Sequence, residues 1–117
     1  MSELILIPGS ATIEELDRII EDDQLIITLD RKCKPAVERA AAVVTAVVNA
    51  DAAVYGVNTG FGKLSSVRIA PEDSATLQRN LILSHCAGVG EVTDPCIVRV
   101  MMALKLLSLG RGATGVR

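Results

Sequence analysis

Residues 55–62 read YGVNTGFG and hold the only tyrosine and the only phenylalanine of this 117-residue chain. A tyrosine phenol can transfer a proton, and glycines let a ligand come close to the backbone. The segment could therefore form a catalytic loop around Tyr55. The alternative is structural: Gly56, Gly60 and Gly62 permit tight turns, and the two aromatic rings cover a core.

The glycines of this segment do not match a phosphate-binding loop. A P-loop requires G-x-x-x-x-G-K-[ST], but five residues separate Gly56 from Gly62, and Leu64 stands where the motif has a hydroxyl. A dinucleotide-binding G-x-G-x-x-G also fails, because the run that starts at Gly60 ends in Ser65. The sequence therefore rejects both phosphate-binding interpretations.

Ser84 stands next to His85, the only histidine of the chain. An imidazole can hydrogen-bond a polar ligand through either ring nitrogen. The pair lies on the same helical face as Leu77 and Leu81. The structural alternative is therefore a half-buried histidine whose nitrogens are satisfied within the fold.

Composition excludes several classes of function. A net charge of −2 and 2% aromatic residues leave no basic patch for nucleic acid. Cys33, Cys86 and Cys96 form an odd set with no CxxC pair, which is typical of reduced thiols in a cytoplasmic protein. With a single histidine, no metal site is expected. The N-terminus shows neither a signal peptide nor a membrane span, so no membrane partner is expected.

Local signals predict one mainly α domain over residues 1–117, with a small β element near the N-terminus. Both candidate groups would lie near its helices, one in the break at residues 51–70 and one late in the third helix. The expected strands are 4–7 and 24–29, and helices are expected from the Thr12–Glu15 capping-box pattern, over 34–49, from Pro71, and from Asp94-Pro95 to Gly110. Their wide apolar faces indicate a partner interface, or the front piece of a longer protein.

Three segments resemble a known family in the expected order. They are Y-G-V-N-T-G-F-G at 55–62, N-L-I-L-S-H-C-A-G-V-G at 80–90 and R-G-A-T-G-V-R at 111–117. Together they resemble the front of the histidine ammonia-lyases, within the aromatic amino acid lyase and aminomutase group. The resemblance covers the whole chain and implies the mainly helical N-terminal domain of the ammonia-lyase fold.

The resemblance also implies roles for individual residues. Tyr55 matches the family's catalytic acid/base, and Gly60 lies in the same loop, where it would help to shape the substrate pocket. Ser84 and His85 match the pair that selects the substrate. Histidine-specific members carry Ser-His there and phenylalanine-specific members carry an apolar pair. The implied reaction eliminates ammonia from L-histidine to give urocanate.

The family's electrophile is 4-methylidene-imidazol-5-one (MIO), formed from an internal Ala-Ser-Gly, and this chain contains no such tripeptide. Ala113-Thr114-Gly115 lies in the matched 111–117 segment, which in the family precedes the electrophile. The expected cofactor would therefore come from outside this chain. The family's enzymes are much longer cytoplasmic homotetramers, so the chain resembles an N-terminal fragment that is inactive alone and self-associates.

Two other interpretations stay open from the sequence. The loop is shared by tyrosine ammonia-lyases and aminomutases, although Ser84 and His85 argue against both. A stand-alone, non-catalytic interaction module would keep the fold and use its apolar surface for a partner.

Overall fold

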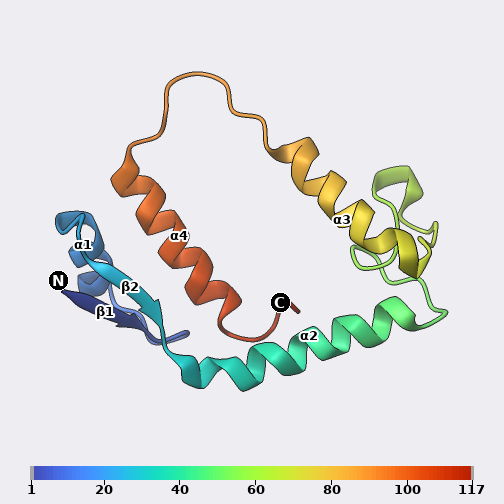
Figure 1. Ribbon diagram of the computed structural model, residues 1–117, viewed down its shortest axis with the longest axis horizontal. Coiled ribbons are helices and arrows are strands. Elements are labelled where there is room, and N and C mark those ends of the chain that lie inside the picture. Colours follow the sequence, from blue (N-terminus) through green and yellow to red (C-terminus); the bar gives the residue numbers. More distant parts are fainter. Residues whose placement is uncertain (1, 117) are drawn as a thin grey trace. The chain divides into compact units, whose positions relative to one another are not determined.

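The structure is a computed structural model that describes residues 2–116, and its contacts divide the chain into two compact units. Unit 1 runs up to Ala41 and resumes at Glu91, whereas unit 2 comprises residues 42–90. The elements, drawn in Figure 1, are β1 (Glu3–Leu6), α1 (Ile13–Glu21), β2 (Ile26–Leu29), η1 (Arg31–Cys33), α2 (Lys34–Asn49), η2 (Gly62–Leu64), α3 (Pro71–His85) and α4 (Pro95–Leu109). By residue number, α2 begins in unit 1 and ends in unit 2.

Unit 1 starts with a β-α-β arrangement. Strands β1 and β2 are parallel, with Glu3 opposite Ile26 and Leu6 opposite Leu29, and they lie side by side in Figure 1. Parallel strands need a crossover connection, which α1 supplies. Its start is fixed by the predicted capping box, in which Thr12 Oγ1 accepts from the Glu15 N–H at 3.2 Å while Glu15 Oε2 accepts from the Thr12 N–H at 2.9 Å.

The hydrophobic core lies in unit 1, between the small sheet and the helices α1 and α4. Alternate residues of β1 point inward, so that Leu4 and Leu6 are buried while Glu3 and Ile5 are exposed. The buried hydrophobic residues are Leu4, Leu6, Ile19, Leu25, Ala103 and Leu107. The core therefore joins the N-terminal β-α-β arrangement to the last helix of the chain.

Arg99 reinforces this joint from α4. Its Nη2 donates to the carbonyl of Leu25 at 2.9 Å and to that of Asp22 at 3.4 Å, where α1 leads into β2. The Ser2 hydroxyl, which donates to Asp22 Oδ2, lowers the pKa of the Asp22 carboxyl, and the positive charge of Arg99 acts in the same direction. Segments distant in sequence are thus joined by polar contacts around the core.

Unit 2 is built differently, because none of its described hydrophobic side chains is fully buried. Its buried residues are Asn58, Thr59, Gly60 and Ser74. In contrast, Val43, Leu64 and Ile82 are each more than half exposed. Hydrogen bonds within the loop between α2 and α3 therefore carry much of the local organisation of this unit.

The predicted fold class is confirmed, since the chain is mainly helical with one small sheet near its N-terminus. The strand β1 lies one residue earlier than expected, over Glu3–Leu6, and β2 is shorter than expected because it begins at Ile26. The expected helix over 34–49 and the starts at Pro71 and Pro95 are confirmed. No helix within residues 2–116 combines the length and the apolar character needed to cross a membrane.

Candidate functional site: the Tyr55 loop and the Ser84–His85 pair

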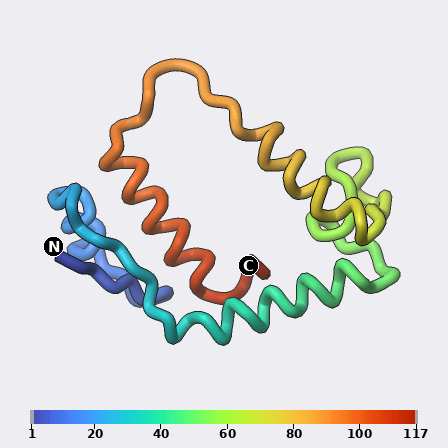
Figure 2. Tube along the Cα trace, in the orientation of Figure 1, coloured from blue at the N-terminus to red at the C-terminus, as the bar shows by residue number. Residues whose placement is uncertain are grey.

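The segment between α2 and α3, residues 50–70, is here called the Tyr55 loop, and Figure 2 traces it back beside the start of α3. Its centre is Asn58, whose side chain is completely buried. Asn58 Oδ1 accepts from the N–H of Val54 at 2.7 Å. Its Nδ2 donates to the carbonyls of Val47 at 3.2 Å and Ala52 at 3.0 Å. One side chain thus joins the last turn of α2 to the start of the loop.

The two ends of the loop also pair with each other through the backbone. The N–H of Ile69 donates to the carbonyl of Asn58 at 2.8 Å, and that of Gly60 donates to the carbonyl of Val67 at 3.1 Å. These bonds hold residues 58–60 beside residues 67–69, directly before α3 begins at Pro71. The Tyr55 loop is therefore closed on itself.

Glycine is favoured at two positions of the loop for different structural reasons. Gly56 has a φ of +78°, a left-handed conformation that residues with a Cβ rarely adopt. A Cβ at Gly60 would lie 2.6 Å from the Cβ of Leu64 and 2.9 Å from its carbonyl oxygen. The close approach of Leu64 accounts for glycine at position 60 without any ligand. The expected contribution of Gly60 to substrate binding stays a prediction.

Tyr55 is presented at the surface of this loop, with 65% of its area exposed. Its ring meets that of Phe61 edge-on, with centroids 6.1 Å apart and planes inclined by 69°. Within residues 2–116 the phenol oxygen has no hydrogen-bond partner. A tyrosine that removes a proton needs neighbours that favour the phenolate. The described chain presents the phenol but supplies no such neighbour.

Ser84 and His85 lie at the C-terminal end of α3 and are both exposed. His85 Nδ1 lies 2.8 Å from the carbonyl oxygen of Leu81 and 3.1 Å from Ser84 Oγ. The Ser84 hydroxyl donates to the same Leu81 carbonyl at 2.8 Å. Because a carbonyl only accepts, this arrangement favours the tautomer with the proton on Nδ1. In the neutral imidazole, Nε2 is then the acceptor.

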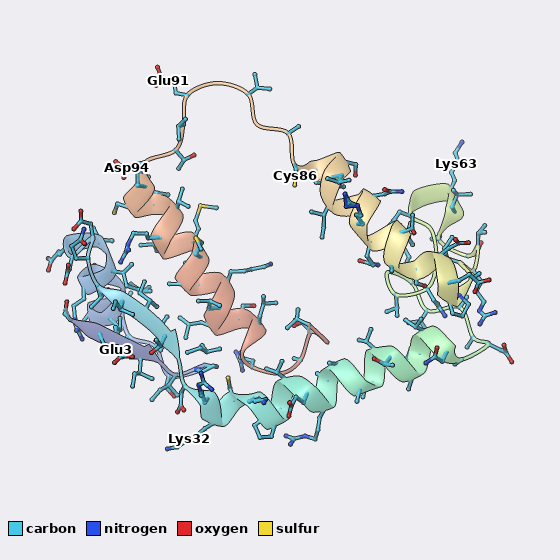
Figure 3. All side chains as sticks on the ribbon, in the orientation of Figure 1. Glu3, Lys32, Lys63, Cys86, Glu91 and Asp94 are labelled. Atoms are coloured by element: carbon cyan, nitrogen blue, oxygen red, sulfur yellow. The ribbon has the colours of Figure 1, made fainter. Side chains whose placement is uncertain are left out.

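The structure does not bring these two groups together. Within the described chain, no hydrogen bond, ion pair or ring contact links the Tyr55 loop to Ser84 or His85. The hydrogen bonds of the loop lie near the N-terminal end of α3, whereas His85 lies at its C-terminal end. A helix of 15 residues is about 22 Å long at 1.5 Å per residue. Figure 3 shows the separation through Lys63 in the loop and Cys86, which follows His85.

Asn58 and Arg68 were not predicted to organise the loop. Arg68 donates from Nη2 to the carbonyl of Ala50 at 2.8 Å and lies 3.7 Å from Asp51 Oδ1. The sequence carried one usable signal, an asparagine placed among turn residues between two predicted helices. Arg68 carried none, because its hydrogen-bond partner is a backbone carbonyl that every residue possesses, and its ion pair with Asp51 joins residues far apart in the sequence.

Comparisons with known proteins show which family the sequence and the fold match. The aromatic amino acid lyase family matches residues 11–117. Histidine ammonia-lyase of Bradyrhizobium diazoefficiens is 53% identical over 114 residues, which are 97% of this chain and 22% of the relative. The chain therefore spans less than a quarter of that relative's length.

Two solved structures share the fold. A tyrosine aminomutase from Streptomyces globisporus has a TM-score of 0.82 over 96% of this chain and 22% of its own. A ligand-bound mutant of a tyrosine aminomutase has a TM-score of 0.81 over 93% of this chain and 21% of its own. Both are 22% identical to the chain, so they establish the fold and no more. With the family match extending through the Tyr55 loop, the Ser84–His85 pair and nearly all of the remaining sequence, the chain belongs to the aromatic amino acid lyase family.

Proposed function

We propose that the chain is the N-terminal part of a histidine ammonia-lyase, which eliminates ammonia from L-histidine to give urocanate. The observation that carries the proposal is the arrangement of His85, an exposed imidazole whose Nδ1 is engaged by its own helix while Nε2 is left to accept. The similarity to a histidine ammonia-lyase over 97% of the chain supports the same substrate.

His85 would recognise the substrate through a hydrogen bond between imidazoles. An N–H of the L-histidine ring would donate to His85 Nε2. A site with an unpaired acceptor discriminates against a ring that has no donor, because the acceptor would be desolvated without a partner. Ser84 would contribute by holding His85 Nδ1 together with the Leu81 carbonyl.

Tyr55 would act as the base that removes a proton from Cβ of the substrate. The electron pair of that C–H bond forms the Cα=Cβ double bond, and the protonated amino group, –NH3⁺, leaves from Cα as ammonia with the electrons of the C–N bond. An ordinary phenol has a pKa of about 10. Tyr55 would therefore need donors or positive charges around its oxygen, which residues outside this chain would have to provide.

The residues of this chain do not fit the family's electrophile. MIO forms from Ala-Ser-Gly, and the sequence lacks that tripeptide. The segment around Ala113-Thr114-Gly115 belongs to unit 1, whereas Tyr55 and His85 belong to unit 2. The chain would thus contribute a base and a specificity residue, while the electrophile would come from elsewhere in the lyase.

The proposal includes a cytoplasmic location and a homotetrameric lyase. The three cysteines are free, as expected for a reducing compartment. The exposed apolar residues of α4, including Ile97, Met101 and Leu104, would be covered in a larger assembly. Alone, the 117-residue chain should self-associate and should not produce urocanate from L-histidine.

The first experiment is to isolate the natural product of this gene, measure its intact mass and assay it with L-histidine. We expect a polypeptide that contains an Ala-Ser-Gly peptide lighter by two waters and that releases urocanate. In that protein, His85→Leu should lower kcat/KM for L-histidine far more than for L-phenylalanine. Equal losses of kcat/KM for both substrates would show that His85 does not select the substrate. A natural product without the modified peptide would contradict the proposed lyase activity.

A further inference from the structure

We propose that Asn58 is a positioning residue that sets the conformation of the backbone carrying Tyr55. The relevance of this role to catalysis rests on the proposed function of Tyr55. The conformational role itself rests only on the contacts of the Tyr55 loop.

The first argument is the number and reach of the contacts. Asn58 bonds to three different backbone groups, at positions eleven, six and four residues earlier in the chain. Ala52 and Val54 shortly precede Tyr55 in the loop, and Val47 belongs to the last turn of α2. The carboxamide therefore fixes the loop relative to a helix rather than only to itself.

The second argument is the set of hydrogen bonds made by Val54, the residue before Tyr55. Val54 donates its N–H to Asn58 Oδ1, and its carbonyl accepts from the N–H groups of Val57 at 3.1 Å and Asn58 at 3.3 Å. Tyr55 and Gly56 are held between these bonds. A change of the Asn58 side chain would free backbone groups that precede Tyr55, at Val47, Ala52 and Val54, although the Tyr55 side chain itself touches Phe61.

The third argument is the lack of an apolar substitute, since the other side chain that ties the loop, Arg68, also acts through polar contacts. Unit 2 has no fully buried apolar side chain that could hold the loop by packing. A buried amide that loses its partners also costs more than the lost bonds, because its polar atoms remain desolvated. Thr59 is almost equally buried, but its hydroxyl reaches only the carbonyl of the adjacent Gly60 at 3.0 Å.

The test uses the two aromatic rings as unique reporters, since the chain has one tyrosine, one phenylalanine and no tryptophan. In Asn58→Asp the side chain keeps an acceptor for Val54 but loses both donors to Val47 and Ala52. We expect the nuclear Overhauser contacts between the Tyr55 and Phe61 rings to disappear and the fluorescence anisotropy of Tyr55 to fall, with the far-ultraviolet circular dichroism of the helices unchanged.

Two variants serve as matched controls. Asn80→Asp makes the same chemical change at an exposed position of α3, and Thr59→Val removes a buried hydroxyl that makes only a local bond. Both should keep the ring contacts and the anisotropy of the parent chain. Ring contacts that survive in Asn58→Asp with intact helices would overturn the positioning role.

If Asn58→Asp loses the helices of unit 2, hydrogen exchange in the unaltered chain decides the question. The carboxamide protons of Asn58 and the amide of Val54 should exchange more slowly than the carboxamide protons of the exposed Asn80. Equal exchange rates would show that the three hydrogen bonds do not hold the loop. None of these measurements depends on turnover, so they separate this inference from the proposed lyase activity.

Discussion

His85 illustrates how a single residue can be oriented by its own helix. The Leu81 carbonyl one turn earlier accepts from the Ser84 hydroxyl and lies at hydrogen-bond distance from His85 Nδ1. The ring is thereby held by one nitrogen while the other faces outward. This division of roles suits a residue that must offer an acceptor to a ligand, because the tautomer is chosen before the ligand arrives.

We expect the neutral form of His85 to carry its proton mainly on Nδ1. Because the chain has only one histidine, nitrogen-15 spectra of the imidazole can be assigned without ambiguity. Ser84→Ala should preserve this tautomer, since the Leu81 carbonyl remains as an acceptor at 2.8 Å. A predominant proton on Nε2 in the unaltered chain would contradict the proposed acceptor role.

At the scale of elements, the predictions succeeded where the signal is local. The starts of α3 and α4 follow from Pro71 and from Asp94-Pro95, since proline is tolerated in the first turn and Asp94 caps the N–H of Cys96 at 2.8 Å. Figure 3 labels Asp94 at this helix start. The parallel pairing of the two strands was not predicted, because pairing depends on partners more than twenty residues apart.

The candidate site was predictable only in part, for a related reason. Residue type and the surrounding glycines singled out Tyr55, whereas His85 was singled out by the family resemblance. The partners of Asn58 and Arg68 could not be predicted from the sequence, because both side chains bond to backbone carbonyls, which every residue possesses. The separation of Tyr55 from His85 along α3 is likewise a property of the fold.

The capping box of α1 provides the element-scale prediction. Thr12→Ala removes the acceptor for the Glu15 N–H and should lower the free energy of unfolding of unit 1 by about 1 kcal/mol. Glu15→Gln should cost less, because glutamine still accepts from the N–H of Thr12. Urea unfolding followed by circular dichroism measures both. Equal losses for the two variants would mean that the charge of Glu15, rather than the cap geometry, stabilises the helix.

At the scale of the molecule, the two units differ in what stabilises them. Unit 1 buries Leu6 and Ile19 almost completely, and contacts from α4 close its core. Unit 2 relies on polar contacts around Asn58 and leaves its larger apolar side chains exposed. Burial of apolar surface is the main favourable term in folding. The isolated chain should therefore be unevenly stable.

We expect backbone amides of α3 to exchange with solvent faster than those of β1, β2 and the second half of α4. Local opening requires little free energy where few apolar contacts are broken. Hydrogen exchange followed by mass spectrometry can assign the rates to peptides from each unit. Comparable protection in both units would contradict the uneven stability and would point to apolar cover on unit 2 from another copy of the chain.

Two matched substitutions locate the origin of this difference. Leu6 is 0% exposed, so Leu6→Ala should destabilise unit 1 by about 2–5 kcal/mol and accelerate its exchange. Val43 is 64% exposed on the part of α2 that belongs to unit 2, so Val43→Ala should leave exchange nearly unchanged. If Val43→Ala instead accelerates exchange in unit 2 at high protein concentration and not at low concentration, self-association through the exposed apolar residues protects that unit. That result would make the apolar surface, together with Asn58, part of what holds the Tyr55 loop in place.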